Sequence, residues 1–234
     1  MRQAVRVDRE PIAAARVLVE KLYPDARWAL LAGSVISGAQ TAGSDLDIVV
    51  LLPDNHPRSP RRESHRHDGW PAELFVHDEA SLTAYLARDG RRPALNRMVA
   101  TGVPVLGDPS RWQQQAAAVL TAGPAELSAD ERDGMRYRLT DNLDDLIYAT
   151  DDGERIVITA ATWTFCAEFA LGMRNHWVGT GKWLLREMRD LDADLAAQWL
   201  AAAGDPDAVA ALARDLLALH GGPLFAGYHV TGRR

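Results

Sequence analysis

The sequence predicts an α/β (α+β) N-terminal domain with a small mixed sheet, followed by an all-α helical-bundle domain. Short apolar runs bounded by turn residues, which are typical of buried strands, are concentrated before residue 110. From Ser110 onward the strand signals are weak and apolar residues recur at helical spacing. Ala122-Gly123-Pro124 interrupts this pattern. We therefore expect the first domain to span residues 1–112 and the second to span residues 124–234.

The elements expected in the first domain follow from local patterns in chain order. Pro11 suits the first turn of a helix, and apolar residues at helical spacing follow it. Asp68-Gly69-Trp70-Pro71 is a turn signal between two runs that alternate as strands do. Asp78 can cap a helix. The expected helices are 11–22, 80–87 and 92–100, and the expected strands are 28–32, 46–52, 63–67, 72–77 and 103–106. The polar, proline-containing segment 54–62 is expected to be a loop.

The second domain is predicted to consist of helices. Ser128 can cap a long helix to about residue 150, because Glu131 occupies the capping-box position. Asp151-Asp152-Gly153 then forms a turn. Further helices are expected over 155–177, 182–189, 193–202 and 206–219, and the last residues, from about 221, are expected to be irregular.

Composition limits the class of protein. The 234 residues are 47% hydrophobic and 25% charged, and the formal net charge of −6 disfavours stable binding to nucleic acid. The one cysteine, Cys166, lies in an apolar stretch and is expected to be a packing residue. No run approaches 18 uninterrupted apolar residues and no signal-peptide pattern is present, so we expect a cytoplasmic protein without a membrane span.

The strongest chemical signal is a glycine-serine pair followed at a fixed spacing by two aspartates. Gly33-Ser34 ends the strand expected at 28–32, and the residues after it can open a short helix whose free N–H groups bind phosphate. Asp45 and Asp47 lie two apart on the next strand, so both point to one face, with Cα atoms roughly 7 Å apart. Two such carboxylates repel without a cation between them, and together with substrate phosphates they suit Mg²⁺.

These residues resemble the nucleotidyltransferase superfamily of DNA polymerase beta, and in particular small bacterial members such as aminoglycoside nucleotidyltransferases. The resemblance rests on Gly33-Ser34 and Ser44-Asp45-Leu46-Asp47 and covers about the first 110 residues. It implies one or two Mg²⁺ ions on Asp45 and Asp47, and a third carboxylate, Glu73, as metal ligand or general base. A surface glutamate on an edge strand is the alternative interpretation of Glu73.

The second half resembles, more loosely, helical domains that follow some of these transferase domains. The resemblance implies a helical substrate-binding domain in which Lys182 contacts the triphosphate and Glu168 is a second base for the acceptor hydroxyl. Lys182 is equally well explained as an exposed residue at a helix start. Glu168 is better explained as a paired structural carboxylate.

The function that follows is Mg²⁺-dependent transfer of a nucleoside monophosphate from a nucleoside triphosphate, with ATP expected, to a hydroxyl of a small molecule. An aminoglycoside-like antibiotic is one acceptor that the resemblance implies, and a monomer or homodimer is expected. Two alternatives stay open: a transferase that modifies a protein by AMPylation, and a catalytically silent module that binds a nucleotide or a partner. Both aspartates are present, which argues against the silent module.

Overall fold

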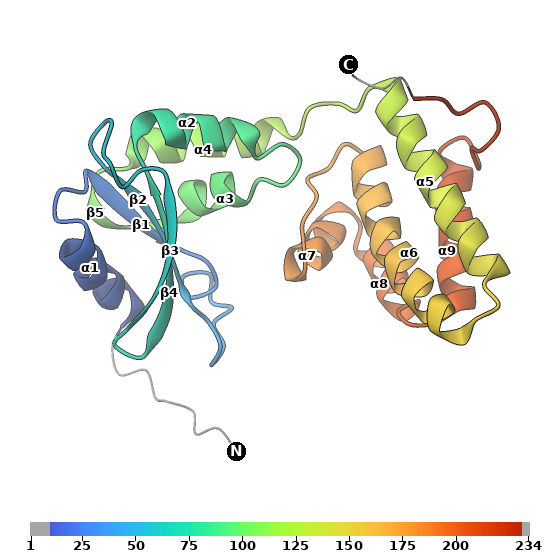
Figure 1. Cartoon of the computed structure of the whole chain (residues 1–234), viewed down its shortest axis with the longest axis horizontal. Coiled ribbons are helices and arrows are strands. Elements are labelled where there is room, and N and C mark those ends of the chain that lie inside the picture. Colours follow the sequence, from blue (N-terminus) through green and yellow to red (C-terminus); the bar gives the residue numbers. More distant parts are fainter. Residues whose placement is uncertain (1–9, 231–234) are drawn as a thin grey trace. The chain divides into compact units, whose positions relative to one another are not determined.

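A computed structural model describes residues 10–230 of the chain, which divides into two compact units. The first unit ends at Ala122 and the second begins at Gly123 (Figure 1). The first unit contains a sheet and helices, and the second is helical throughout its regular structure. This architecture confirms the predicted fold class.

The first unit is built on a five-stranded mixed sheet. The strand order is β3-β4-β2-β1-β5, with β2 and β4 parallel and the other neighbouring pairs antiparallel. The elements are α1 (Pro11–Leu22), β1 (Trp28–Ala32), β2 (Leu46–Leu51), β3 (Arg61–His67), β4 (Trp70–His77), α2 (Glu79–Arg88), α3 (Ala94–Thr101), β5 (Val103–Gly107) and α4 (Ser110–Ala122).

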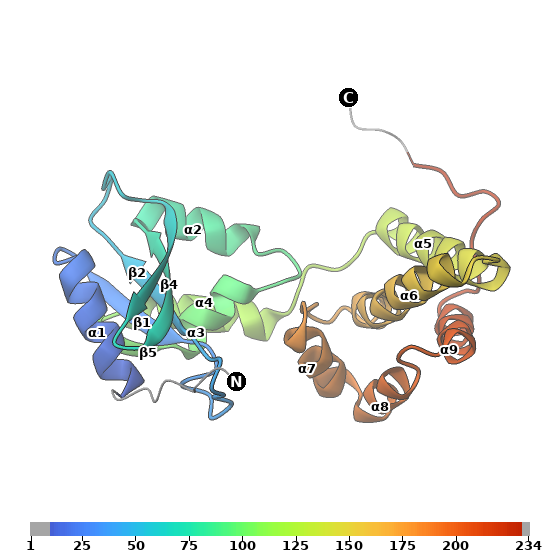
Figure 2. The same cartoon turned by 60° about the horizontal axis from the view of Figure 1, so that its bottom comes forward.

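Helices cover both faces of this sheet, and the alternation of side chains along each strand decides which residues meet them. Ile48 and Val50 pack with α1 in one apolar cluster, whereas Val49 and Leu51 pack with α2, α3 and α4 in another. Figures 1 and 2 show α1 on one side of the strands and α2 on the other. Because β2 is covered on both faces, it is apolar at almost every position after Asp47.

The β3–β4 hairpin has a register that its turn determines. Asp68 and Gly69 both have positive φ, 48° and 83°, as the two central residues of a type I′ turn require. The two-residue turn pairs His67 with Trp70 and, further along, Ser64 with Glu73. Trp70 and Pro71 therefore belong to β4 rather than to the turn in which the sequence placed them.

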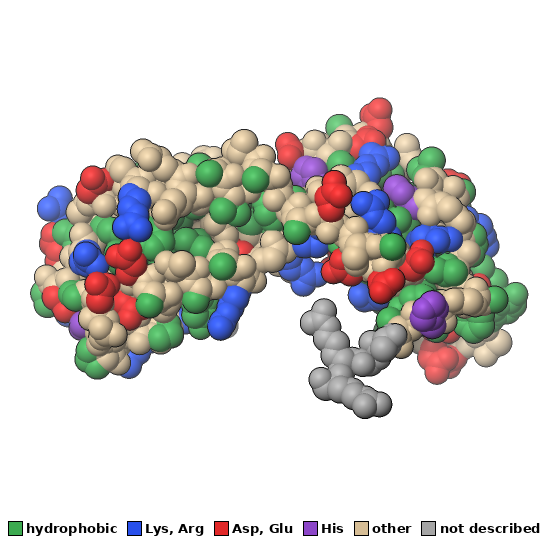
Figure 3. Space-filling view, turned by 90° about the horizontal axis from the view of Figure 1, so that it is seen from above, with side chains coloured by type: hydrophobic (Ala, Val, Ile, Leu, Met, Phe, Trp, Pro, Cys, Tyr) green, Lys and Arg blue, Asp and Glu red, His purple; other side chains and the backbone are tan. Residues whose placement is uncertain are grey.

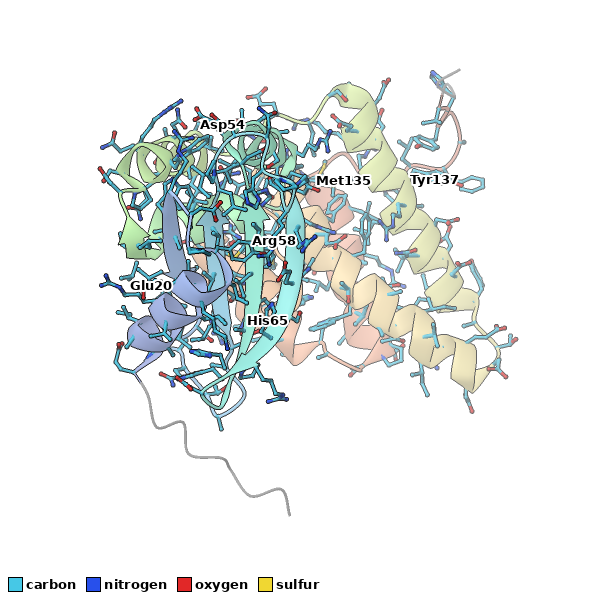
Figure 4. The ribbon with its side chains drawn as sticks, turned by 60° about the vertical axis from the view of Figure 1, so that its left-hand side comes forward. Glu20, Asp54, Arg58, His65, Met135 and Tyr137 are labelled. Atoms are coloured by element: carbon cyan, nitrogen blue, oxygen red, sulfur yellow. The ribbon has the colours of Figure 1, made fainter. Side chains whose placement is uncertain are left out.

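A polar cluster joins β3 to α1 on the α1 side of the sheet. Glu63 accepts hydrogen bonds from the hydroxyl of Tyr23 (2.6 Å), from Arg61 (3.1 Å) and from Arg58 (3.3 Å). The guanidinium of Arg58, which is labelled in Figure 4, also lies over the Tyr23 ring at 4.0 Å. Burial acts to raise the pKa of Glu63, but hydrogen bonds from Tyr23, His65, Arg61 and Arg58 outweigh it and lower the pKa to about 2.

The second unit is a helical bundle with its own apolar core. Ser128 caps its first helix, and Glu131 completes the capping box as predicted. Trp163 and Trp199 stack at 4.2 Å, and each ring N–H donates to the backbone carbonyl of the other residue. Tyr137, which is labelled in Figure 4, stacks on Tyr228 with ring centroids 4.2 Å apart. The helices are α5 (Ala129–Tyr148), α6 (Asp152–Met173), α7 (Lys182–Leu191), α8 (Ala193–Ala201) and α9 (Pro206–Leu219).

Helix α6 is long and apolar enough to cross a membrane by length and composition, although its apolar residues do not form an uninterrupted run. Glu168 interrupts the apolar part of the helix, and 56% of its apolar window is buried inside the protein. Phe165, Phe169 and Leu171 on this helix belong to the core cluster. Burial of this kind is typical of the central helix of a globular bundle.

Element bounds differ from the prediction mainly where the end of a helix depends on tertiary packing. Helix α4 packs against α3 and belongs to the first unit, so this unit extends beyond residue 112 to Ala122. The helix predicted over 155–177 runs from Asp152 to Met173. It ends there because Asn175 adopts a positive φ of 52°, which a continuing helix does not allow.

Charged side chains of both signs are interspersed on the face drawn in Figure 3. The whole chain has 26 basic and 32 acidic side chains, which gives the net charge of −6. The face in Figure 3 therefore carries charges of both signs.

Candidate active site

Three carboxylates meet at one edge of the first unit. Asp47 on β2 lies opposite Glu73 on the parallel strand β4, and Asp45 directly precedes β2. Ligand oxygens of Asp45, Asp47 and Glu73 lie within 4.8 Å of one another, and all three residues are half-buried. The structure therefore brings together the three acidic residues that the sequence singled out.

The carboxylates share a face because of the strand period of two. Leu46 and Ile48 are fully buried on the α1 side, so Asp47 between them points to the opposite face. The same alternation buries Ala72 and Leu74 on either side of Glu73. Apolar residues on one face thus hold the carboxylates on the other face.

Gly33 allows Asp47 to sit against the end of β1. Ala32 pairs with Asp47 across the β1–β2 ladder, and Gly33 follows it with a φ of 82°. A Cβ atom built on Gly33 would overlap Oδ2 of Asp47 and lie 3.2 Å from its Cγ. Only glycine meets both requirements, a left-handed backbone and room for the carboxylate.

Ser34 is held by a second serine near the aspartates. Its hydroxyl lies 2.8 Å from that of Ser44, and the backbone N–H of Thr41 donates to Ser44 at 2.9 Å. Both serines are buried. The residues after Ser34 form turns and not the short helix that the sequence predicted, and Gly38 with a φ of 73° lies at the end of this segment. Any phosphate contact here would come from turn N–H groups and a hydroxyl.

Arg62 is a neighbour of the carboxylates that the sequence analysis assigned to a loop. It lies on β3 and donates from its guanidinium to Oε2 of Glu73 at 2.6 Å. Arg62 also lies over the Phe75 ring at 5.0 Å. The signal that could have found it is the register of the β3–β4 hairpin, which places Arg62 opposite Phe75, two residues from Glu73.

The three carboxylates are a chemically suitable ligand set for a divalent cation. Carboxylate oxygens are the ligands that Mg²⁺ takes in proteins, usually from one or two carboxylates together with substrate phosphates. Three carboxylates this close repel one another unless positive charge is near. Arg62 supplies such a charge at Glu73. The fit to a divalent cation is therefore good, although the donor set by itself does not select Mg²⁺ from similar ions.

Lys182 and Glu168 belong to the second unit. Lys182 is exposed at the first position of α7, directly after Gly181, whose φ is 54°. Glu168 is half-buried on α6, between buried Ala167 and Phe169. Their roles toward the triphosphate and the acceptor stay predictions.

A second group of metal-type side chains lies in the second unit, where the sequence analysis did not seek one. Nδ1 of His176 is 3.4 Å from Glu187, and Nε2 is 3.3 Å from Asp190. The two carboxylates therefore flank opposite ring nitrogens. These contacts join the segment before α7 to that helix.

Comparison with known proteins supports the identity of the first unit. Residues 16–87, which include Gly33, Ser34 and the three carboxylates, match the sequence model of the nucleotidyltransferase domain family. The structure of a nucleotidyltransferase-like protein from Exiguobacterium sibiricum 255-15 is 13% identical, with a TM-score of 0.46. The match covers 89% of this chain and 74% of that one. No curated protein matches this chain. The family match shows that residues 16–87, within the first unit, form a nucleotidyltransferase domain.

Proposed function

We propose that the protein transfers a nucleoside monophosphate from a nucleoside triphosphate to the hydroxyl of a small molecule and releases pyrophosphate. The observation that carries the proposal is the convergence of Asp45, Asp47 and Glu73 beside Gly33-Ser34, within a nucleotidyltransferase domain. ATP is the donor that we expect. An aminoglycoside-like acceptor was implied by the resemblance of the sequence, and the role of the helical unit in acceptor binding is a further proposal.

In this reaction the acceptor oxygen attacks the α-phosphorus, and the bond from that phosphorus to the bridging oxygen of the β-phosphate breaks. Pyrophosphate leaves with the electron pair of that bond. Catalysis of such a transfer is mostly positioning and charge neutralisation. Mg²⁺ held by Asp45, Asp47 and Glu73 would supply Lewis-acid charge neutralisation at the phosphate oxygens.

The residues around the carboxylates have separate tasks in the proposal. The backbone N–H of Gly33 and the hydroxyl of Ser34 bind the distal phosphates, because both lie at the end of β1 next to Asp47. Ser44 orients the Ser34 hydroxyl through their 2.8 Å hydrogen bond. Glu73 accepts the proton of the acceptor hydroxyl, and Arg62 orients its carboxylate until the substrates bind.

The test is Mg²⁺-dependent pyrophosphate release from each of the four ribonucleoside triphosphates in the presence of a panel of hydroxylated acceptors. Asp47→Asn keeps the shape of the side chain but removes its charge, so it should abolish acceptor-dependent release. Asp54→Asn is the matched control, because Asp54 is exposed in the loop after β2 and pairs with Arg27. Release that Asp47→Asn leaves unchanged would refute the assignment of the site.

The two alternatives predict different results in the same assay. A silent binding module would bind the triphosphate with Mg²⁺ and release no pyrophosphate with any small acceptor or protein. A protein-modifying transferase would label a protein with the nucleotide and ignore the small acceptors. Either outcome would replace the small-molecule acceptor in the proposal.

A further inference from the structure

A cavity of about 370 Å³ lies on the face of the sheet that carries the three carboxylates, and its lining includes Arg62, which is hydrogen-bonded to Glu73. Phe75 and His77 line it from β4, Tyr85 from α2, and Leu95 and Met98 from α3. Glu73, Phe75 and His77 alternate with the buried residues of β4, so the three share a face with roughly 7 Å between successive Cα atoms. The cavity therefore begins one side chain beyond Glu73.

Arg62 links the cavity to the carboxylates. It lines the cavity, lies over the Phe75 ring at 5.0 Å and donates to Glu73 at 2.6 Å. A group in the cavity would thus contact the same guanidinium that orients the third carboxylate. Arg61 and Arg62 both line the cavity and outnumber its one lining carboxylate, that of Asp89, so the charges of the lining disfavour a cationic group there.

The lining selects a planar group that can accept or donate one hydrogen bond. Phe75 and Tyr85 present aromatic rings, and Tyr85 is 44% exposed, whereas Leu95 and Met98 add apolar surface. His77, by contrast, is only 5% exposed. A polar atom of such a residue normally has a hydrogen-bond partner.

His77 has one ring nitrogen available to a ligand. Its Nδ1 lies 3.4 Å from the Ser81 hydroxyl, and its ring contacts that of Tyr85 at 5.1 Å. Within residues 10–230, Nε2 of His77 makes no hydrogen bond. It is also not among the side-chain atoms that are both fully enclosed and without a hydrogen bond, so it faces open space. We conclude that Nε2 opens onto the cavity that His77 lines.

The cavity walls are held in place before any ligand binds. Asp89 accepts hydrogen bonds from the backbone N–H of Asn96 at 2.8 Å and from its side chain at 3.0 Å. The same side chain donates to the carbonyl of Leu86 at 3.0 Å. These bonds join the end of α2 to the start of α3. Small-molecule sites are usually preformed in this way and occupy roughly 300–1,000 Å³.

The chemistry of the transfer decides which substrate would use the cavity. The attacking and leaving oxygens must lie roughly in line on either side of the phosphorus. Gly33-Ser34 follows β1, on one side of Asp47, and Glu73 lies on β4, on the other side. If the leaving phosphates lie toward β1, the attacking hydroxyl approaches from the β4 side, where the cavity is.

We infer that the cavity binds the acceptor, and that the acceptor is an alcohol carried on a planar aromatic or heteroaromatic group without a cationic ring. The inference rests on the proposed function and deepens it. The ring stacks against Phe75 and Tyr85, a heteroatom of the ring bonds to Nε2 of His77, and the alcohol reaches Glu73. A polycationic aminoglycoside does not suit this cavity.

The test uses ¹³C-methyl methionine NMR with tryptophol, which is a planar heteroaryl alcohol, as the probe. Cyclohexylethanol serves as a non-planar comparison and kanamycin as a polycationic one. Met98 lines the cavity, whereas Met135, Met173 and Met188 lie in the second unit and report non-specific binding. Met98→Leu assigns the Met98 signal. Tryptophol should shift the Met98 signal at lower concentration than cyclohexylethanol, and kanamycin should leave it unshifted.

Tyr85→Ala should weaken tryptophol binding about 2- to 12-fold, the value expected when an aromatic contact is lost. Tyr148→Ala is the matched control, because Tyr148 is 78% exposed in the second unit. In the transfer assay, Tyr85→Ala should raise the KM for tryptophol and leave kcat nearly unchanged. Equal shifts from all three probes, or an equal effect of Tyr148→Ala, would overturn the inference.

Titration with ATP and Mg²⁺ separates failure of this inference from failure of the proposed function. If ATP alone shifts Met98 and competes with tryptophol, the cavity binds the nucleotide base, and the inference about the acceptor is wrong while the proposed function stands. If ATP binds in an Asp47-dependent way and tryptophol never shifts Met98, the inference is also wrong. Loss of Asp47-dependent ATP binding itself would instead contradict the proposed function.

Discussion

Replacing Gly33 by alanine adds one methyl group at the point where β1 meets Asp47. Two costs follow from the structure. The backbone there has a φ of 82°, and a residue with a side chain loses about 1–2 kcal/mol in this region. The new Cβ would also overlap Oδ2 of Asp47 and approach its Cγ to 3.2 Å, so the carboxylate must rotate away. Gly33→Ala should therefore impair both the stability and the site.

The two costs can be separated with Gly38→Ala. Gly38 has a similar φ of 73°, but nothing lies within 4 Å of a Cβ built on it. Both variants should lower the free energy of unfolding by about 1–2 kcal/mol. Only Gly33→Ala should displace a metal ligand, and a displacement of about 1 Å at a reacting centre reduces activity by about 100-fold, or about 2.7 kcal/mol.

The assay is calorimetric titration of ATP in the presence and absence of Mg²⁺, with thermal unfolding of each variant measured in parallel. Wild type and Gly38→Ala should show similar Mg²⁺-dependent affinity, and Gly33→Ala should lose most of it while staying folded. Equal losses in both variants would show that backbone strain in the segment from Gly33 to Gly38 matters and that contact with Asp47 does not. Wild-type affinity in Gly33→Ala would refute the reasoning altogether.

Two further predictions concern stability and the lone thiol. The folded protein keeps Glu63 ionised to a pKa of about 2, below the ordinary 4.5, so its contribution to stability is complete above pH 4.5 and is lost as the pH falls toward 2. The loss of stability is at most about 3 kcal/mol. In urea unfolding between pH 2 and 7, the free energy of unfolding should depend less on pH in Glu63→Gln than in the wild type. An unchanged pH profile in this variant would contradict the role of Glu63 in the cluster. Cys166 is 1% exposed, and burial raises its thiol pKa to about 12, so a disulfide reagent should label it only after denaturation. Stoichiometric labelling of the native protein would show that the helical core opens.

Many local elements of both units were predictable because each has its own signal in the chain. The strand over 28–32 and the helix capped at Ser128 follow from short-range patterns, and the structure has both. Helix α4 was not delimited, because its place in the first unit comes from packing on α3. A local sequence pattern does not reveal which distant residues will pack together.

Asp45 and Asp47 were recognisable from the sequence because residues two positions apart along an extended segment point to the same face. Glu73 was a weaker assignment, since nothing local states that β4 runs parallel to β2 and pairs with it. The expected helix after Ser34 was wrong because positive-φ glycines turn the chain there. Arg62 was placed in a loop, although the type I′ turn at Asp68-Gly69 determines its position opposite Phe75.

The sequence by itself determined the two-part α+β and helical architecture, the Gly33-Ser34 and Asp45-Asp47 motif and the chemistry that this motif suits. The physical reason is that strand and helix periods, caps and turns act over a few residues. Only the tertiary structure decided that Glu73 completes the carboxylate group, that Arg62 stands beside it, and that Phe75, Tyr85 and Met98 enclose a cavity. Those contacts depend on strand order and on helices packed across the sheet, which no local stretch of sequence specifies.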